Sequence, residues 1–299
     1  MNPSSSITIT GATGWLGKEL IYLLTNLDIQ NLELDLISSS EQEIEVNYRK
    51  FRTNIFTKNR SIKTDIYFDF AFLTREKINL LGKERYLEIN NRIINNSIDL
   101  IKRKHPKTVI LASSGAVYRQ GFKHFQEDYN LYSSLKSMQE EKIGAACFDI
   151  GVDLIVTRIF NLSGNGINKI NTFAIAELIS RAFQNQTLQI RSNYLVYRRY
   201  SDISQLLKLL LKLHELNYTG TFDSGGVKIE LRDLARTIVK QLKSKCELDF
   251  ADIGKDSSPD EYFSKSNLYE ELLVKCLNER PLLMSQQIAN TKNSLFPSI

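Results

Sequence analysis

The feature that most constrains the fold of this chain is a regular alternation of short apolar runs with longer amphipathic segments. Runs with the character of strands occupy residues 6–10, 32–37, 65–73, 108–113 and 153–160. Helical periodicity fills several of the intervals between them. Strands that alternate with helices in this way form a parallel sheet covered by helices on both faces. The sequence therefore predicts an α/β fold with a doubly wound parallel sheet.

The alternation decays after about residue 162. Two strongly amphipathic segments, 171–186 and 229–245, are separated by shorter pieces and predict helices. We therefore expect a smaller, mostly helical C-terminal lobe. The predicted division assigns residues 1–162, with a return segment near 196–226, to the sheet domain, and residues 163–195 and 227–299 to the lobe.

Composition and charge narrow the class of protein. The net charge of +5 is spread among acidic residues, and the basic cluster at 101–107 ends a predicted helix, where cations complement the helix dipole. The three cysteines are far apart and lack the spacing of a metal site. No signal-peptide pattern and no run of 18 apolar residues occurs. We expect a cytoplasmic protein with no metal and with no nucleic-acid or membrane partner.

Three glycines at three-residue spacing follow the first predicted strand. Gly11, Gly14 and Gly17 lie in TGATGWLG, between a strand that ends at Thr10 and a helix that begins near Trp15. Glycines let a phosphate approach the backbone N–H groups and the positive dipole of a helix N-terminus. A plain tight turn is the alternative interpretation. The position after the first strand of an alternating fold favours a dinucleotide-binding turn.

Two motifs downstream carry side chains suited to catalysis. ASSGAVY (112–118) brings a serine cluster to the carboxyl end of a strand, where open parallel sheets bind ligands. A polar strand end is the alternative. YSSLK (132–136) spaces Tyr132 and Lys136 four residues apart, on one face of a helix, so that the ammonium can favour the ionised phenol.

Together these motifs resemble the extended branch of the short-chain dehydrogenase/reductase superfamily, whose members include nucleotide-sugar epimerases, dehydratases and reductases. TGATGWLG resembles its glycine fingerprint, and ASSGAVY and YSSLK resemble its serine and tyrosine–lysine motifs. The resemblance extends from residue 5 to about 240. It implies a Rossmann-type fold with a substrate-binding C-terminal lobe, and it implies that Ser114, Tyr132 and Lys136 are catalytic.

Weaker similarities complete the implied binding sites. Segment 65–73 resembles the strand beneath the nicotinamide-side ribose, with Asp69 where many relatives carry a histidine. RIFNLSG and YRRYSDI resemble segments that contribute Asn161 and Arg198 to the substrate site, together with Ser114. A strand-end cap for Asn161 and a surface ion pair for Arg198 are the alternatives. The implied cofactor-binding residues are Gly11, Thr13, Gly14, Trp15, Leu16, Gly17, Asp35, Ser38, Ser39, Phe70, Ala71, Leu73, Asn90, Tyr132 and Lys136.

The chemistry implied by the resemblance is hydride transfer to or from a nicotinamide, coupled to proton exchange between Tyr132 and a sugar hydroxyl that Ser114 also hydrogen-bonds. Relatives that eliminate water or decarboxylate carry carboxyl groups just after the catalytic serine, where this chain has Gly115 and Ala116. The pattern favours 4-epimerisation of a nucleotide-activated sugar through a transient keto sugar. The alternatives are an NADPH-dependent 4-ketoreductase of a nucleotide keto-deoxy sugar and a non-catalytic dinucleotide-binding sensor.

The choice between NAD and NADP stays open at this point. An acid at the end of the second strand usually binds the adenosine ribose, and Asp35 has the spacing for it. The run ISSS, however, is expected to prolong the strand and to bring Ser38 or Ser39 to its tip, where a 2′-phosphate is better tolerated. Relatives commonly dimerise through helices that correspond to 85–104 and 132–147, so we expect a homodimer.

Overall fold

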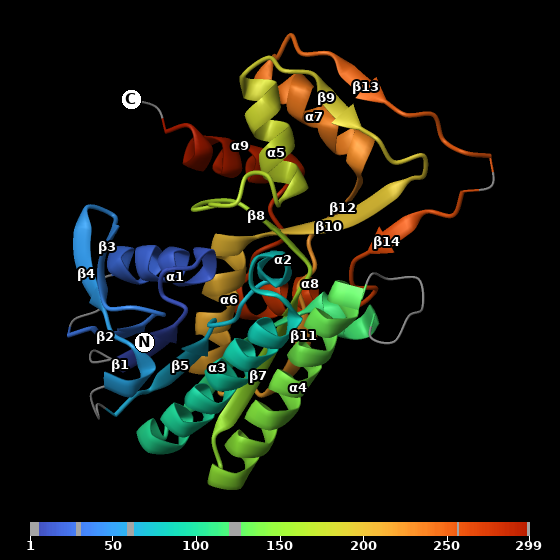
Figure 1. Ribbon diagram of the computed structural model, residues 1–299. Coiled ribbons are helices and arrows are strands. Elements are labelled where there is room, and N and C mark those ends of the chain that lie inside the picture. The colour runs from blue at the N-terminus through green and yellow to red at the C-terminus, as the bar shows by residue number, and fades with distance from the viewer. Residues whose placement is uncertain (1–5, 28–30, 59–62, 120–126, 256, 298–299) are drawn as a thin grey trace. The chain divides into compact units, whose positions relative to one another are not determined.

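The computed structural model describes residues 6–27, 31–58, 63–119, 127–255 and 257–297 (Figure 1). The chain divides into two compact units. Unit 1 comprises Met1–Ile159 and Leu210–Phe222, and unit 2 comprises Phe160–Leu209 and Asp223–Ile299. The segment that returns to unit 1 is shorter than 196–226, because the strand at Val196–Asp202 pairs with strands of unit 2.

Unit 1 is built on a six-stranded sheet in the order β11-β7-β6-β5-β1-β2. Neighbouring strands from β2 through β1, β5 and β6 to β7 pair in parallel. This arrangement confirms the predicted α/β fold. The strands are β1 (Ser6–Thr10), β2 (Glu33–Ile37), β5 (Ile66–Asp69), β6 (Thr108–Ser114), β7 (Asp153–Ile159) and β11 (Gly220–Asp223).

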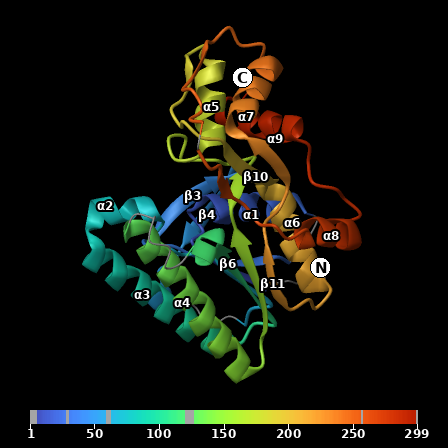
Figure 2. The same ribbon diagram turned by 90° about the vertical axis from the view of Figure 1, so that its right-hand side faces the viewer.

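Helices cover both faces of this sheet. Figure 2 shows the two longest, α3 (Lys83–Lys104) and α4 (Glu127–Ile150), side by side on one face, with α1 (Trp15–Asn26) on the other. Apolar side chains of α3 and α4, such as Leu100 and Ile143, join those of the strands in one buried cluster. Short helical segments lie at the ends of these elements: η1 (Phe56–Lys58), η2 (Arg75–Lys77), α2 (Ile78–Leu81) and η3 (Gly115–Arg119).

A β-hairpin follows the second strand of the sheet. Its strands β3 (Gln42–Val46) and β4 (Arg49–Thr53) pair antiparallel, and the turn residues Asn47 and Tyr48 both have positive φ, as a two-residue type I′ turn requires. After the hairpin, Asn54 forms an isolated parallel bridge with Ile37, and Ser38 N–H donates to Asn54 O (2.9 Å). β2 itself ends at Ile37, so the expectation that ISSS prolongs the strand is wrong.

Unit 2 mixes helices with short strands. Its central strand β10 (Val196–Asp202) pairs antiparallel with β12 (Val227–Glu230) and parallel with β8 (Asn161–Ser163) and β14 (Asp260–Tyr262). The predicted helical lobe is thus a mixed α/β unit. The other elements that lie wholly in it are α5 (Ala174–Phe183), β9 (Leu188–Ile190), α7 (Leu231–Leu242), β13 (Leu248–Phe250), α8 (Leu268–Leu272), the π-helix η4 (Leu273–Leu277) and α9 (Met284–Leu295).

One helix, α6 (Ile203–Glu215), begins in unit 2 and ends in unit 1. Asp202 lies immediately before it, and its Oδ1 accepts hydrogen bonds from the N–H groups of Ser204 (3.0 Å) and Gln205 (3.1 Å). This is the usual way in which an aspartate satisfies the first donors of a helix.

A buried ion pair ties β2 to the C-terminal end of α3. Lys104 Nζ lies 2.8 Å from Asp35 Oδ2, and the two side chains are 1% and 8% exposed. An ammonium so completely removed from water needs a partner charge, because burying a lone charge is costly. The pair therefore fixes the register of α3 against the sheet.

Replacing Lys104 with Met leaves the Asp35 carboxylate buried without its cation, so we expect unfolding to cost about 3–5 kcal/mol less. Urea denaturation should show a lower midpoint at an unchanged slope. Lys102→Met, at an exposed position of the same helix, is the control and should change stability by less than about 0.5 kcal/mol. The double variant Asp35→Leu/Lys104→Met should recover stability. Wild-type stability in Lys104→Met would contradict this assignment.

Candidate active site

The glycine turn after β1 brings three backbone segments into close contact. Gly11 has a φ of +67°, and a Cβ built on it would lie 2.8 Å from the Phe70 carbonyl. A Cβ on Gly17 would lie 2.5 Å from Gly11 O. Gly14 N–H donates to Gly11 O (2.9 Å), which closes the turn. Side chains at Gly11 and Gly17 would therefore force the turn away from the end of β5 and away from α1.

This turn fits a dinucleotide pyrophosphate. Gly14 is the N-cap of α1, is exposed, and offers no side-chain cap to the helix. The first turn of α1 also contains no acidic residue that would repel an anion. Backbone N–H groups and the positive helix dipole there suit a phosphate. The neighbouring side chains expected at the cofactor are Thr13 and Leu16, which are half-buried, and Trp15, which is buried.

The side chains expected around the adenosine ribose lie in different environments. Asp35 is in the middle of β2 and holds Lys104. Ser38 is buried, and its hydroxyl contacts Thr53 Oγ1 (2.9 Å) and donates to Ser40 O (2.5 Å). Ser39 is exposed. The ion pair and the hairpin thus engage Asp35 and Ser38 within the fold, and the ribose role of all three residues stays a prediction.

The segment after β5 is held by side chains from two other elements. Thr10 Oγ1, at the end of β1, accepts from the N–H groups of Phe70 and Ala71, both at 3.1 Å. Asn90 is buried in α3, and its Oδ1 accepts from Leu73 N–H (2.9 Å). Asn90 therefore holds the loop that follows β5, and its role at the cofactor stays a prediction.

The three residues expected to be catalytic gather at the carboxyl end of β6 and on α4. Ser114 is the last residue of β6, and its hydroxyl interacts with Tyr132. The Phe72 ring lies edge-on to the Tyr132 ring, 5.9 Å between centroids, and Lys136 Nζ lies 3.9 Å from the centroid of the same Phe72 ring. Tyr132 and Lys136 thus share one aromatic neighbour on one face of α4.

The pKa values of Tyr132 and Lys136 in the chain by itself differ from the expected ones. Burial raises the pKa of Tyr132 to about 12, against the lowering effect of the Ser114 hydroxyl. Burial also lowers the pKa of Lys136 to about 8, against the raising effects of the Asp69 and Glu140 carboxylates. The expected lowering of the tyrosine pKa by the lysine is therefore not seen here, because desolvation is the larger effect at both groups.

Sequence reasoning missed the partners of the lysine. Lys136 Nζ donates to Ala112 O and to Gln139 Oε1, both at 2.9 Å, and Gln139 Nε2 donates to Asp69 Oδ2 (3.3 Å). Gln139 follows Lys136 by three residues, a spacing that puts two side chains on one helix face. That spacing was the only feature of the local sequence that indicated a contact between Gln139 and Lys136.

In unit 2, Asn161 and Arg198 make contacts within the fold. Asn161 Nδ2 donates to the carbonyls of Arg199 (3.3 Å) and Tyr262 (3.4 Å). Arg198 Nη2 lies 2.7 Å from Asp260 Oδ2. The structure thus shows the ion pair that was one interpretation of Arg198. Substrate contacts by Asn161 and Arg198 stay predictions.

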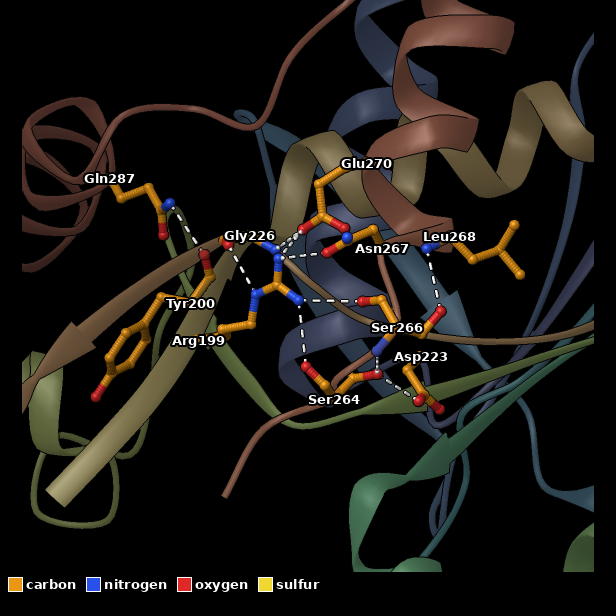
Figure 3. A network of polar contacts seen from close by, with 10 residues as sticks. All are labelled: Arg199, Tyr200, Asp223, Gly226, Ser264, Ser266, Asn267, Leu268, Glu270 and Gln287. Carbon is orange, nitrogen blue, oxygen red and sulfur yellow. Dashed lines mark hydrogen bonds and ion pairs between the residues drawn. The ribbon is translucent and has the colours of Figure 1, made fainter. Parts of the chain in front are cut away.

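The next residue, Arg199, is the centre of a polar network (Figure 3). Its guanidinium donates to Gly226 O (3.1 Å), Ser264 O (3.2 Å) and Ser266 O (3.0 Å), and it pairs with Glu270 Oε1 at 2.9 Å. Glu270 Oε1 also accepts from Gly226 N–H (2.7 Å). The network joins β10 to the start of β12 and to the segment before α8, and the sequence carried no signal for it.

Two further findings concern the part of the chain that the structure describes. No group of three His, Cys, Asp or Glu side chains there converges as a metal ion would require. None of its helices combines the length and the apolar character needed to cross a bilayer.

Solved structures of known proteins share this fold. A UDP-N-acetylglucosamine 4-epimerase from Methanobrevibacter ruminantium is 18% identical, with 98% of each chain covered and a TM-score of 0.76. A UDP-glucose 4-epimerase from Thermus thermophilus, solved with NAD, is 13% identical, with 98% of this chain and 100% of that chain covered and a TM-score of 0.72. An NAD-dependent NDP-hexosamine 5,6-dehydratase of tunicamycin biosynthesis is 16% identical, with 99% of each chain covered and a TM-score of 0.76.

No curated protein matches the chain by sequence. The model of the NAD dependent epimerase/dehydratase family, in contrast, matches residues 7–221. This match includes the glycine turn, the serine at the end of β6 and the tyrosine–lysine pair of α4. It confirms the resemblance drawn from those motifs. The chain belongs to the NAD dependent epimerase/dehydratase family.

Proposed function

We propose that the chain catalyses the 4-epimerisation of a nucleotide-activated sugar through a transient keto sugar, with NAD retained throughout. The observation that carries the proposal is that the Ser114 hydroxyl interacts with Tyr132, while Tyr132 and Lys136 share the Phe72 ring. Residues 115–118, directly after the serine, contain no carboxyl side chain. Elimination of water by an acid at that place is therefore disfavoured, and chemistry that needs only a serine, a tyrosine and a lysine remains.

Each of the three side chains has a task in this proposal. The Tyr132 phenolate takes the proton of the sugar hydroxyl during oxidation and returns it during reduction. The Ser114 hydroxyl donates to the same sugar oxygen and stabilises the charge that develops on it. The Lys136 ammonium favours the phenolate, which matters here because burial holds the tyrosine pKa at about 12 in the chain by itself.

The turn at Gly11, Gly14 and Gly17 would hold the cofactor pyrophosphate, with the N-terminus of α1 supplying N–H donors. When bound, NAD supplies the reversible hydride acceptor of the cycle. NAD is proposed over NADP because the family is NAD-dependent and the Thermus neighbour was solved with NAD.

The cofactor carried by the purified protein tests the retained-cofactor cycle. We expect protein purified without added cofactor to release close to one NAD per chain on denaturation, because an epimerase ends each turnover with the cofactor it began with. Mass spectrometry of the released dinucleotide gives its identity and stoichiometry. Empty protein that then binds NADPH reversibly would contradict the epimerase and support a 4-ketoreductase.

Replacing Tyr132 with Phe removes the proton carrier and keeps the ring that packs on Phe72. We expect turnover to fall about 10²–10⁴-fold while NAD content stays at the wild-type level. UDP-glucose and UDP-N-acetylglucosamine, the sugars named for the neighbours, serve as first probes, with product measured by chromatography. Tyr129→Phe, one turn earlier on α4, is the matched control and should keep wild-type turnover. Unchanged turnover in Tyr132→Phe would contradict the assigned role.

A further inference from the structure

One buried carboxylate in unit 1 lies behind the site residues and is not used by the proposed chemistry. Asp69 ends β5 and is 0% exposed. Its Oδ1 accepts from Thr10 Oγ1 (2.8 Å) and Ser97 Oγ (2.9 Å), and its Oδ2 accepts from Gln139 Nε2 (3.3 Å). All three donors are neutral groups. They satisfy the hydrogen-bonding capacity of the carboxylate oxygens but contribute no positive charge to balance the carboxylate.

The charge that compensates it is reached through the side-chain amide of Gln139. The amide donates to Asp69 with its nitrogen and accepts from Lys136 Nζ (2.9 Å) with its oxygen. An amide that is fixed at both ends has one orientation, since a flip would set its NH₂ group against the ammonium and its oxygen against the carboxylate. The contact between Lys136 and Ala112 O (2.9 Å) then fixes a second direction of the ammonium.

The other carboxylate that acts on Lys136 is already paired. Glu140 Oε2 lies 2.7 Å from Arg158 Nη2, and Arg158 Nε adds a bond of 3.0 Å to Glu140 Oε1. Asp69 on β5 and Glu140 on α4 are the charges that act on Lys136. Tyr132 on α4 shares the Phe72 ring with it. Because Arg158 already neutralises Glu140, Asp69 is the carboxylate whose negative charge Lys136 can balance.

We propose that Asp69, acting through Gln139, is a positioning residue for Lys136: the pair holds the ammonium charged and aimed beside Tyr132. The catalytic consequence of this inference rests on the proposed function. The effect of Asp69 on Lys136 rests only on the hydrogen bonds through Gln139. The same carboxylate orients Thr10, whose hydroxyl oxygen accepts from the N–H groups of Phe70 and Ala71. It thereby couples the lysine to the loop that follows β5.

The test measures the titration of Lys136 in the full chain, without cofactor or sugar. Protein is labelled with [13Cε]lysine, and the Lys136 resonance is assigned by its absence in Lys136→Met. Gln139→Met breaks the chain with a side chain of similar shape, and Asp69→Asn removes the charge. Gln139→Met removes an acceptor of the ammonium and its path to Asp69, and Asp69→Asn removes the opposite charge. In both variants we therefore expect the pKa of Lys136 to fall from about 8 by about one unit or more.

Ser97→Ala is the matched control. It removes a hydrogen bond to the same carboxylate (2.9 Å) and leaves the path through Gln139 intact, so the Lys136 pKa should stay at the wild-type value. A shift in Ser97→Ala as large as that in Gln139→Met would overturn the proposal, because it would show a general effect of loosened packing. An unchanged Lys136 pKa in Gln139→Met would also overturn it. Urea denaturation midpoints verify that each variant is folded. If Asp69→Asn does not fold, the result for Gln139→Met alone decides the test.

The pH dependence of turnover adds the catalytic consequence. With the ammonium as the productive form, the alkaline limb of kcat in Gln139→Met should move about one pH unit toward neutrality, with a smaller change in KM. An unmoved limb in a variant whose Lys136 pKa has fallen would overturn the catalytic part. If no sugar is turned over by the wild type, the proposed function fails while the lysine titration still decides the positioning role.

Discussion

The architecture of unit 1 depends on satisfying one buried carboxylate. Asp69 is fully buried, and burial raises its pKa, so donors must surround it if it is to stay ionised. Those donors come from β1, α3 and α4, through Thr10, Ser97 and Gln139. A shift of any of these elements would leave the charge unsatisfied. The carboxylate thus fixes the elements that carry the glycine turn and the tyrosine–lysine pair.

Burial sets the electrostatic state of the candidate site. Removal from water raises the pKa of Tyr132 to about 12 and lowers that of Lys136 to about 8. These shifts favour a neutral Tyr132 phenol and weaken the positive charge of Lys136. The positive charge of an oxidised nicotinamide would favour the phenolate. Membership of an NAD-dependent family agrees with this requirement.

Unit 2 uses two adjacent arginines to connect its own elements. Arg198 is paired with Asp260, and Arg199 joins β10 to residues around Ser264 and Glu270. A planar guanidinium with five donors suits such a junction, because several carbonyls can share it. Adjacent residues on a strand point to opposite faces, so two arginines in a row meet different partners. Sequence alone gave no means of telling which partner each would find.

The sequence by itself determined the features that depend on local spacing. The alternation of strands and helices, the glycine turn and the tyrosine–lysine pair follow from residues close together in the chain, and the fold and family derived from them are confirmed. Only the tertiary structure decided which side chains the buried charges meet. Asp35 meets Lys104 and Asp69 meets Gln139 across long stretches of sequence. Desolvation selects such partners, and it acts only once the whole sheet and its helices have come together.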